Sequence, residues 1–402
     1  MNESNLLASV LGQVLPEDAS RACLVGRVWC PGPLAGPRLV VVRNDTLVDI
    51  SSTAATMAAL LALPNPLEAV QRASGEPLGA LAAWFADTCR HGASPLHRHL
   101  MAPNDLQVVK AAGVTFAASM IERVIEEMTR GDPRGADAAR QVVQAAVGDN
   151  LARLRPGSPE AMRLKQILIE RKLWSQYLEV GIGPDAEIFT KAPPMASVGT
   201  GVRVGLHPAS QWNNPEPEVV LAIGPNAQVM GAALGNDVNL RDFEGRSALL
   251  LGKAKDNNAS CAIGPFIRLF DDDFGLEDVR LMQVELKVEG VDGYVLQGSS
   301  SMQQISRDPL ELVQHAMGKH HQYPDGAMLF CGTMFAPVED RDVLGGGFTH
   351  HLGDRVTVSS SRLGALVNWV DHCDKVPPWA FGIGALMNNL AARGLLPSRA
   401  AD

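Results

Sequence analysis

Cysteine is sparse in this sequence, and its basic residues form no block. The six cysteines are dispersed, with neither a CxxC pair nor a small disulfide framework, which is typical of a reducing compartment. The 35 Lys and Arg face 44 Asp and Glu, and the net charge of −9 leaves no clustered positive footprint for phosphates. No run approaches the ~18 apolar residues of a membrane span, and the N-terminus lacks a basic region followed by a long apolar core. We therefore expect a soluble, cytoplasmic protein with no nucleic-acid or membrane partner.

The chain is long enough for two domains, since single cores stop growing well below 402 residues. Residues 21–50 contain short β-like runs with Gly and Pro turns, whereas 54–90 show helical spacing of Ala, Leu and Met. Residues 116–178 have apolar residues at i, i+3 and i+4, and from about Lys191 onward β-rich segments dominate.

These shifts predict three regions. We expect a small mixed α/β N-terminal domain at 1–105, a mainly helical connecting segment at 106–186, and a β-rich domain at 187–402. Within the helical segment, "SPEAMRLKQILIERKLW" begins with Ser158, Pro159 and Glu160, which are cap and first-turn signals. The sequence shows no internal repeat and no low-complexity tract.

Two carboxylates one residue apart precede an apolar run in "NNPEPEVVLAIG". Pro217 favours extended backbone for itself and for Glu216, and the β-branched residues that follow predict a strand. Side chains two apart on a strand share a face, so Glu216 and Glu218 are expected side by side. Two parallel carboxylates repel each other unless a positive charge lies between them. Taken alone, each glutamate could equally stand on a solvated edge.

A third carboxylate follows in "GNDVNLRDFEG", where Asp237 comes after a strand-like run. If this segment is a helical turn, Asp237, Arg241 and Glu244 share a face. Three carboxylates describe a site for a hard cation, Mg²⁺ or alternatively Mn²⁺ or Ca²⁺, and no Cys or His cluster points to a softer metal. The alternative reading of Asp237 alone is a helix cap.

The succession "PEPEVVLAIG", "GNDVNLRDFEG", "GKAKDNNASCAIGPF", "DGAMLFCGTMFAP" and "HHLGDRVTVSSSRLGALVNWV" resembles the C-terminal catalytic domain of the fumarylacetoacetate hydrolase superfamily, over roughly 187–371. The resemblance implies an α+β fold with a mixed β-sandwich roll. It also implies that the glutamate pair and the aspartate hold Mg²⁺ or Ca²⁺, and that "CGT" lines the substrate pocket. The matching residues are Glu216, Glu218, Asp237, Arg241, Lys255 and Thr333.

One departure indicates the branch of the superfamily. Its hydrolases and acylpyruvases usually carry Tyr and then His in the segment "GVTFAASMIER", and this chain has Phe116 and Ser119 there. That segment, with "LWSQYLEVGIGPDAEIFTKA" and "HPASQWNNPEPE", resembles instead the 2-keto-3-deoxy-D-xylonate and 2-keto-3-deoxy-D-arabinonate dehydratases. The implied reaction converts a 2-keto-3-deoxypentonate into 2-oxoglutarate semialdehyde.

The chemistry suits these residues. A 2-keto acid offers carboxylate and carbonyl oxygens to a cation that stabilises the enolate formed on loss of a C3 proton, and β-elimination of the C4 hydroxyl follows. Lys255 is the expected base, with a pKa lowered by a nearby cation and by desolvation; the alternative is a surface ammonium. Glu187 is the candidate acid, and Lys191 competes for that role.

Further polar groups are candidate substrate ligands. Arg241 is one, although an intrahelical pair with Asp237 is its alternative. The segment 298–309 is a hydroxyl-rich loop suited to sugar hydroxyls, or else a flexible turn. The complete set of expected substrate-binding residues is Arg241, Ser210, Asn214, Ser119, Phe116, Lys191, Ser300 and Thr333.

Two other functions stay open at this point. One is a carbon–carbon hydrolase of acylpyruvates or 2,4-diketo sugar acids, and the other is a catalytically idle protein that captures a keto acid through Mg²⁺. Product analysis separates a hydrolase, which yields two fragments, from a dehydratase, which yields one aldehyde. We expect a homodimer or homotetramer, and the stereochemistry of the substrate stays open.

Overall fold

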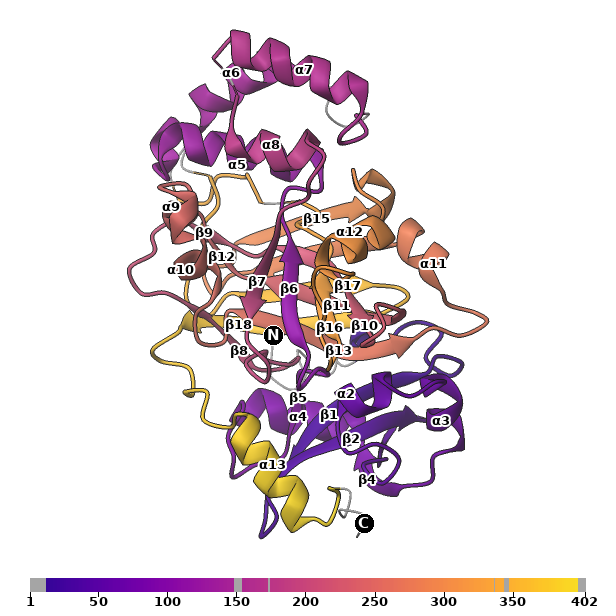
Figure 1. Ribbon diagram of the computed structural model, residues 1–402. Helices are drawn as coiled ribbons and strands as arrows, with labels where there is room; N and C mark the ends of the chain where they lie inside the picture. Colours follow the sequence, from indigo (N-terminus) through magenta and orange to yellow (C-terminus); the bar gives the residue numbers. More distant parts are fainter. Residues whose placement is uncertain (1–11, 148–153, 173, 336, 343–346, 397–402) are drawn as a thin grey trace.

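The computed structural model describes residues 12–147, 154–172, 174–335, 337–342 and 347–396. Figure 1 shows a helical unit at the top, β-sheets in the middle, and at the bottom a mixed unit that holds the first strands and the last helix. Helices and strands are therefore segregated along the chain, as the predicted α+β class requires.

The larger sheet has eleven strands within the described residues, in the order β4-β3-β2-β1-β13-β11-β10-β16-β6-β7, with β5 paired to β1. Its pairs are antiparallel except β16 with β6, which is parallel. The strands are β1 (Leu24–Cys30), β2 (Gly36–Arg43), β3 (Thr46–Asp49), β4 (Glu76–Ala80), β5 (His99–Met101), β6 (Val108–Ala112), β7 (Ile188–Ala192), β10 (Pro217–Ile223), β11 (Val229–Asp237), β13 (Cys261–Leu269) and β16 (Ala327–Phe330).

A five-stranded sheet packs against the centre of the larger one, where β14 contacts β10, β17 contacts β11 and β18 contacts β13. Its strands run in the order β15 (Val295–Ser301), β14 (Gln283–Glu289), β17 (Arg355–Ser360), β18 (Gly364–His372) and β8 (Arg203–Leu206). A separate ribbon pairs β9 (Asn213–Asn214) with β12 (Asn239–Leu240).

The strand β10 is buried on both faces, which explains its continuous apolar sequence. Val219 and Leu221 pack in the core between the two sheets. Val220 and Ala222 point the other way, into a core shared with Met57 of the helix α2 (Met57–Leu61). The carboxylates that precede and begin this strand are therefore interior groups, and the solvated-edge reading of them is wrong.

The helical unit consists of α5 (Ala117–Thr129), α6 (Ala136–Val147), α7 (Pro159–Glu170) and α8 (Gln176–Ile182). This confirms the helical pattern predicted for 116–178 in its described part. Ser158 caps α7 as predicted, because its hydroxyl accepts a hydrogen bond from the Ala161 N–H at 3.2 Å. The helix α5 lies lowest in the unit, directly above the sheets (Figure 1).

The N-terminal strands continue the sheet of the C-terminal segment, because β1 pairs with β13 at Leu24 and Arg268. The last helix also packs on this unit, where Asn389 Nδ2 donates to the Ala35 carbonyl at 2.8 Å. The predicted division at 105 and 186 remains a prediction. The other helices are α2 (Met57–Leu61), α3 (Pro66–Arg72), α4 (Leu81–His91), α9 (Arg241–Glu244), α10 (Leu251–Lys255), α11 (Leu276–Leu281), α12 (Pro309–Ala316) and α13 (Ile383–Ala392).

Three local expectations are corrected. The strand β4 interrupts the helical region expected at 54–90, because it pairs with β3 at the edge of the sheet. Asp237 ends β11 as expected, but the helical turn and the helix cap considered for it are not formed, because the helix α9 starts four residues later. The hydroxyl-rich segment 298–309 begins inside β15.

In the described part of the chain, we find no helix with the length and apolar character needed to cross a membrane.

Candidate active site

Three buried carboxylates converge at one end of the strands β10 and β11. Glu216, Glu218 and Asp237 each offer an oxygen within 4.8 Å of the other two, and each side chain is about 1% exposed. They form the one group of three or more potential metal ligands found among the described residues. The structure thus brings together the three residues that the sequence predicted as one cation site.

Strand register explains why these side chains meet. Pro217 pairs with Asn236 across the two strands, so Glu216 lies opposite Asp237, whose N–H donates to the Glu216 carbonyl at 3.0 Å. Glu218 follows two residues after Glu216 on the same face. Pro217 is tolerated in this central position because it is the first residue of its strand.

Two buried lysines supply positive charge to the cluster. Lys255 Nζ donates to a Glu216 carboxylate oxygen and lies 3.2 Å from Asp237 Oδ2. Lys191 Nζ lies 2.8 Å from Asp237 Oδ1 and donates to the Val238 carbonyl at 3.1 Å. Burial opposes ionisation of Asp237, but the two lysines outweigh it and hold the pKa of Asp237 below its usual range.

No side-chain cation hydrogen-bonds to Glu218 among the residues that the structure describes. The Gly332 N–H donates to it at 2.6 Å and the Thr333 hydroxyl at 3.3 Å. Burial, followed by the charges of Asp237 and Glu216, raises the pKa of Glu218 well above its usual range. The raised pKa means that Glu218 is the carboxyl of the three whose charge is least compensated. Three converging carboxylate oxygens, one of them without a side-chain countercharge among the described residues, fit a hard divalent cation.

The lowered pKa of Lys255 was expected beside a bound cation, and without a cation the surroundings of Lys255 act in the opposite direction. Burial alone lowers the pKa of Lys255, but the charges of Asp237, Glu216 and Glu244 outweigh it and raise the pKa above its usual range. Lys255 is also buried, so its alternative reading as a surface ammonium is wrong. A divalent cation would neutralise the same carboxylates that cause this rise.

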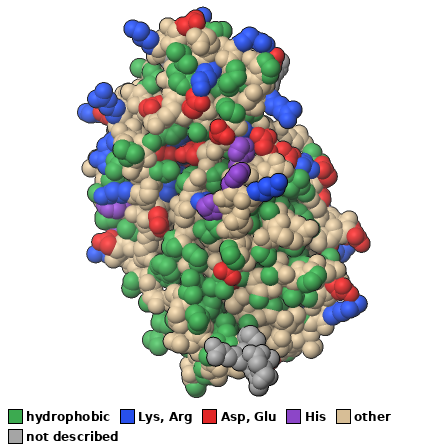
Figure 2. Space-filling view, in the orientation of Figure 1, with side chains coloured by type: hydrophobic (Ala, Val, Ile, Leu, Met, Phe, Trp, Pro, Cys, Tyr) green, Lys and Arg blue, Asp and Glu red, His purple; other side chains and the backbone are tan. Residues whose placement is uncertain are grey.

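A small cavity of about 10 Å³, roughly the space of one water molecule, adjoins the carboxylates. Five acidic side chains line it, together with two basic ones. Figure 2 shows acidic side chains gathered where the helical unit meets the sheets. The charged residues of the lining are Glu187, Glu216, Glu218, Asp237, Glu244, Arg123 and Lys255.

Glu187 enters this cavity from the start of β7. Burial, followed by the nearby charge of Glu244, raises the pKa of Glu187 to about 7. Gly113 leaves the room that its carboxyl occupies, since a Cβ at Gly113 would lie 1.8 Å from Glu187 Oε2. A carboxyl with a pKa near neutrality is suited to proton transfer.

A second ion network joins the cavity to the helix α5. Arg123 contacts a Glu216 oxygen, Glu126 at 2.6 Å and Glu244 at 3.1 Å. Sequence reasoning missed Arg123, Glu126 and the role of Glu244. The available signal was the charged spacing of "SMIERVIEEM", in which Glu122, Arg123 and Glu126 fall on one side of an otherwise apolar helix.

Arg241 belongs to the same network and not to the cavity wall. It donates to Glu126 and to Glu122, each at 2.7 Å, and its guanidinium lies 4.3 Å from the ring centroid of Trp212. The intrahelical pair with Asp237 is not formed. Arg241 therefore holds α5 and α9 together, and it does not reach the three carboxylates of Glu216, Glu218 and Asp237.

The other expected substrate ligands fall into two groups. Ser119 and Thr333 line the cavity, together with Lys255 and Glu187. Lys191 lies behind Asp237 and outside the lining. The remaining residues are also elsewhere: Phe116 is buried in the core between the sheets, Ser210 bonds Asp242 at 2.8 Å, Asn214 bonds the Pro215 carbonyl at 2.9 Å, and Ser300 is buried in β15.

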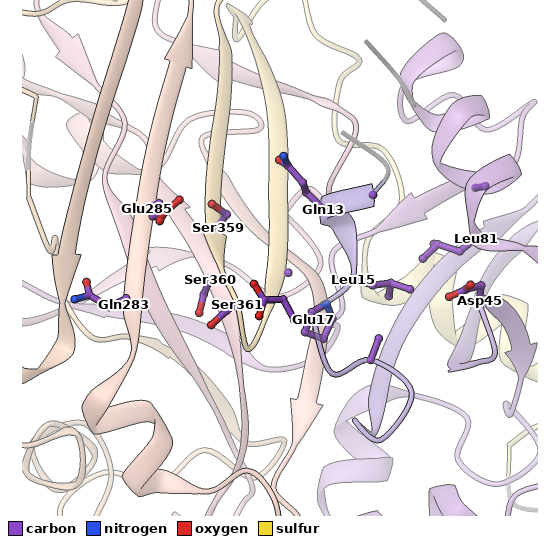
Figure 3. Close-up of a pocket in the computed structure, with 15 residues that line it drawn as sticks. Gln13, Leu15, Glu17, Asp45, Leu81, Gln283, Glu285, Ser359, Ser360 and Ser361 are labelled. Atoms are coloured by element: carbon purple, nitrogen blue, oxygen red, sulfur yellow. The ribbon is translucent and has the colours of Figure 1, made fainter. Parts of the chain in front are cut away.

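A larger cavity of about 860 Å³ lies elsewhere, between the N-terminal segment and the strands β14 and β17 (Figure 3). Glu17, Asp45 and Glu285 supply its charge, and no Lys, Arg or His is found among the described residues that line it. An anionic substrate would meet only negative charge there. The small cavity at the carboxylates is therefore the candidate active site despite its size.

Comparison with known proteins identifies the class. Residues 182–371 match the family described as fumarylacetoacetate (FAA) hydrolase C-terminal. The match covers the segment in which the sequence motifs resemble this family. Among solved structures, a 2-keto-3-deoxy-D-arabinonate dehydratase in its apo form has a TM-score of 0.59 at 20% identity, over 87% of this chain and 99% of its own. That likeness confirms the fold.

Two curated relatives are more specific. A probable 2-keto-3-deoxyxylonate dehydratase from Haloferax volcanii is 25% identical over 333 residues, which are 83% of this chain and 95% of the relative. A 2-dehydro-3-deoxy-D-arabinonate dehydratase from Saccharolobus solfataricus is 28% identical over 190 residues, which are 47% of this chain and 60% of the relative. Both relatives thus carry the names of sugar-acid dehydratases.

Proposed function

We propose that this protein is a Mg²⁺-dependent hydro-lyase that converts a 2-keto-3-deoxy-D-pentonate into 2-oxoglutarate semialdehyde. The names of both curated relatives support the proposal. So does a solved neighbour of the same fold that is complexed with magnesium and 2,5-dioxopentanoate, which is the semialdehyde itself. The observation that carries the proposal is the buried carboxylate cluster with Lys255 and Glu187 beside it.

Glu216, Glu218 and Asp237 would hold the cation, with Mn²⁺ or Ca²⁺ as alternatives to Mg²⁺. When bound, Mg²⁺ supplies a Lewis acid for the adjacent carboxylate and keto oxygens of a 2-keto acid. Lys191 supports the site by keeping Asp237 ionised, and the Gly332 N–H and the Thr333 hydroxyl orient Glu218.

Two groups of the cavity handle protons in the proposed reaction. One must take a proton from C3 of the substrate, and the other must give a proton to the departing C4 hydroxyl, which leaves as water. Tautomerisation of the resulting C3–C4 alkene, with protons lost from C5 and its hydroxyl and gained at C3 and C4, then leaves the aldehyde at C5. We assign the base to Lys255 and the acid to Glu187, whose pKa of about 7 keeps a large protonated fraction at neutral pH. The carboxylates of Asp237, Glu216 and Glu244 raise the pKa of Lys255, and a bound divalent cation would offset that effect, so that the amine of Lys255 can accept the C3 proton.

Hydrolysis of a carbon–carbon bond receives no support from the cavity. Its described lining contains Ser119 and no histidine, so the imidazole that would activate water in the hydrolases has no counterpart there. The Ser119 hydroxyl donates to the Phe116 carbonyl at 2.9 Å.

A cytoplasmic location and a homodimer or homotetramer remain predictions.

The purified protein should be assayed with Mg²⁺ and, separately, with 2-keto-3-deoxy-D-xylonate and 2-keto-3-deoxy-D-arabinonate. A coupled aldehyde dehydrogenase reads the semialdehyde, and Asp237→Asn serves as the matched inactive variant. We expect turnover of at least one stereoisomer and loss of it in EDTA. No semialdehyde from either substrate would overturn the proposal.

A further inference from the structure

Arg123 is the one arginine in the lining of the cavity, among the residues the structure describes there. It is buried, and its three anionic partners come from different elements: Glu126 from its own helix α5, Glu244 from α9, and Glu216 from the start of β10. One guanidinium nitrogen, Nη1, contacts Glu126 and Glu244. The other, Nη2, contacts Glu216.

Both carboxylate oxygens of Glu216 are thus occupied by side-chain cations. Arg123 contacts Oε1 and Lys255 contacts Oε2. A divalent cation at the carboxylate cluster needs at least one of these oxygens and repels both side-chain cations. Arg123 and the metal ion therefore compete for Glu216.

Loss of Glu216 as a partner does not free the whole arginine. Glu126 and Glu244 still hold Nη1, so the guanidinium stays at the cavity wall while the N–H groups of Nη2 lose their acceptor. A buried donor without an acceptor is costly, and a planar guanidinium fork matches a carboxylate better than a lysine ammonium does. The vacated side of Arg123 is therefore suited to an anionic oxygen pair.

We propose that Arg123 binds the carboxylate of the 2-keto acid and that it becomes available for this when the cation takes over Glu216. The inference rests on the proposed function, which supplies the 2-keto acid as the ligand. Arg241 cannot take this role, because its guanidinium donates hydrogen bonds to Glu122 and Glu126 and stacks on the ring of Trp212. It also does not line the cavity.

Arg123→Met separates this role from a structural one by two calorimetric titrations. Mg²⁺ alone should bind about tenfold tighter or more, since a competing charge is removed. Pyruvate, the smallest 2-keto acid, should bind the Mg²⁺-saturated variant about tenfold weaker or more, since a charge-assisted hydrogen bond is lost. If Arg123 had only a structural role, Arg123→Met would lower the affinities for Mg²⁺ and for pyruvate together.

A second variant covers the case in which Arg123→Met does not fold. Arg123→Lys keeps the charge beside Glu126 and Glu244 but loses the planar fork, so Mg²⁺ affinity should stay within about threefold while pyruvate binds about tenfold weaker. Arg140→Gln is the matched control, because Arg140 pairs with Glu122 in the same network without lining the cavity. It should leave both affinities within about twofold.

The inference is overturned if pyruvate binds these Arg123 variants as it binds the wild type, if Mg²⁺ binds Arg123→Met more weakly, or if pyruvate does not bind the Mg²⁺-loaded wild type. None of these titrations requires turnover. Arg123→Met could bind Mg²⁺ more tightly and pyruvate more weakly even though the wild type fails to dehydrate either pentonate. In that case the proposed reaction fails and the carboxylate site at Arg123 stands.

Discussion

Glu216 and Asp237 face each other across the strands β10 and β11, where the Asp237 N–H donates to the Glu216 carbonyl at 3.0 Å. Their side chains meet again at Lys255, whose ammonium contacts both carboxylates. Backbone pairing therefore holds two of the three proposed metal ligands at a set separation before any cation binds.

Removal of single carboxylates should abolish Mg²⁺-dependent turnover but affect stability unequally. Glu216→Gln leaves Lys255 and Arg123 short of a partner and should lower the free energy of unfolding of the metal-free protein by about 1–3 kcal/mol. Glu218→Gln relieves like-charge repulsion and should leave that free energy unchanged or higher. Urea unfolding in EDTA measures both, and equal destabilisation would contradict the charge assignment.

Gly113→Ala should impair turnover without unfolding the protein. The added Cβ would meet Glu187 Oε2, which is the end of a flexible side chain that can turn away. If Glu187 has the proposed catalytic role, displacement of its carboxyl should lower kcat by about 10²-fold. Gly384→Ala in α13 is the control, because its Cβ meets nothing within 4 Å. Wild-type kcat in the Gly113 variant would remove Glu187 from the mechanism.

The pH profile should report the protonation of Glu187. If Glu187 is the acid, it must carry its proton, so kcat should be retained below its pKa of about 7 and fall as the pH rises through that value. Glu187→Gln should lower kcat by about 10² to 10⁴ and abolish this alkaline limb. A kcat that rises through pH 7 and loses that rise in the Gln variant would make Glu187 the base.

Lys255→Met tests the base. Deuterium exchange at C3 of a substrate analogue that lacks the C4 hydroxyl isolates proton removal from elimination. The wild type should exchange, and the Met variant should do so about 10² to 10⁴ more slowly. Exchange at the wild-type rate with failed dehydration of the true substrate would make Lys255 the acid, and normal rates in both would exclude it from the chemistry.

Short-range patterns predicted the parts of the site that depend on strand periodicity. The spacing of Glu216 and Glu218 determines their common face, and Asp237 was expected at the end of a neighbouring strand. The helix capped by Ser158 followed from local signals in the same way. Each of these features depends on residues close together in the sequence or on the ends of adjacent strands.

The residues that sequence reasoning missed depend on contacts between distant segments. Arg123, which was missed, meets Glu216 across 93 positions, and Arg241, whose partner was not foreseen, meets Glu122 across 119. From the sequence alone, a charged side chain on a helix is expected to face solvent. Its burial can be foreseen only if the oppositely charged residue that contacts it from a distant segment is known. Ser300 was expected in a hydroxyl-rich loop after a strand, although it lies buried within a strand of the smaller sheet.

The central claim is that the carboxylate cluster with a bound divalent cation serves a dehydration, and nuclear magnetic resonance of the reaction in D₂O tests it most directly. With 2-keto-3-deoxy-D-xylonate or its arabinonate isomer and Mg²⁺, we predict one five-carbon aldehyde that carries deuterium at C3 and C4, and no product in EDTA. Two carbonyl fragments, or the same rate in EDTA as in Mg²⁺, would contradict the account.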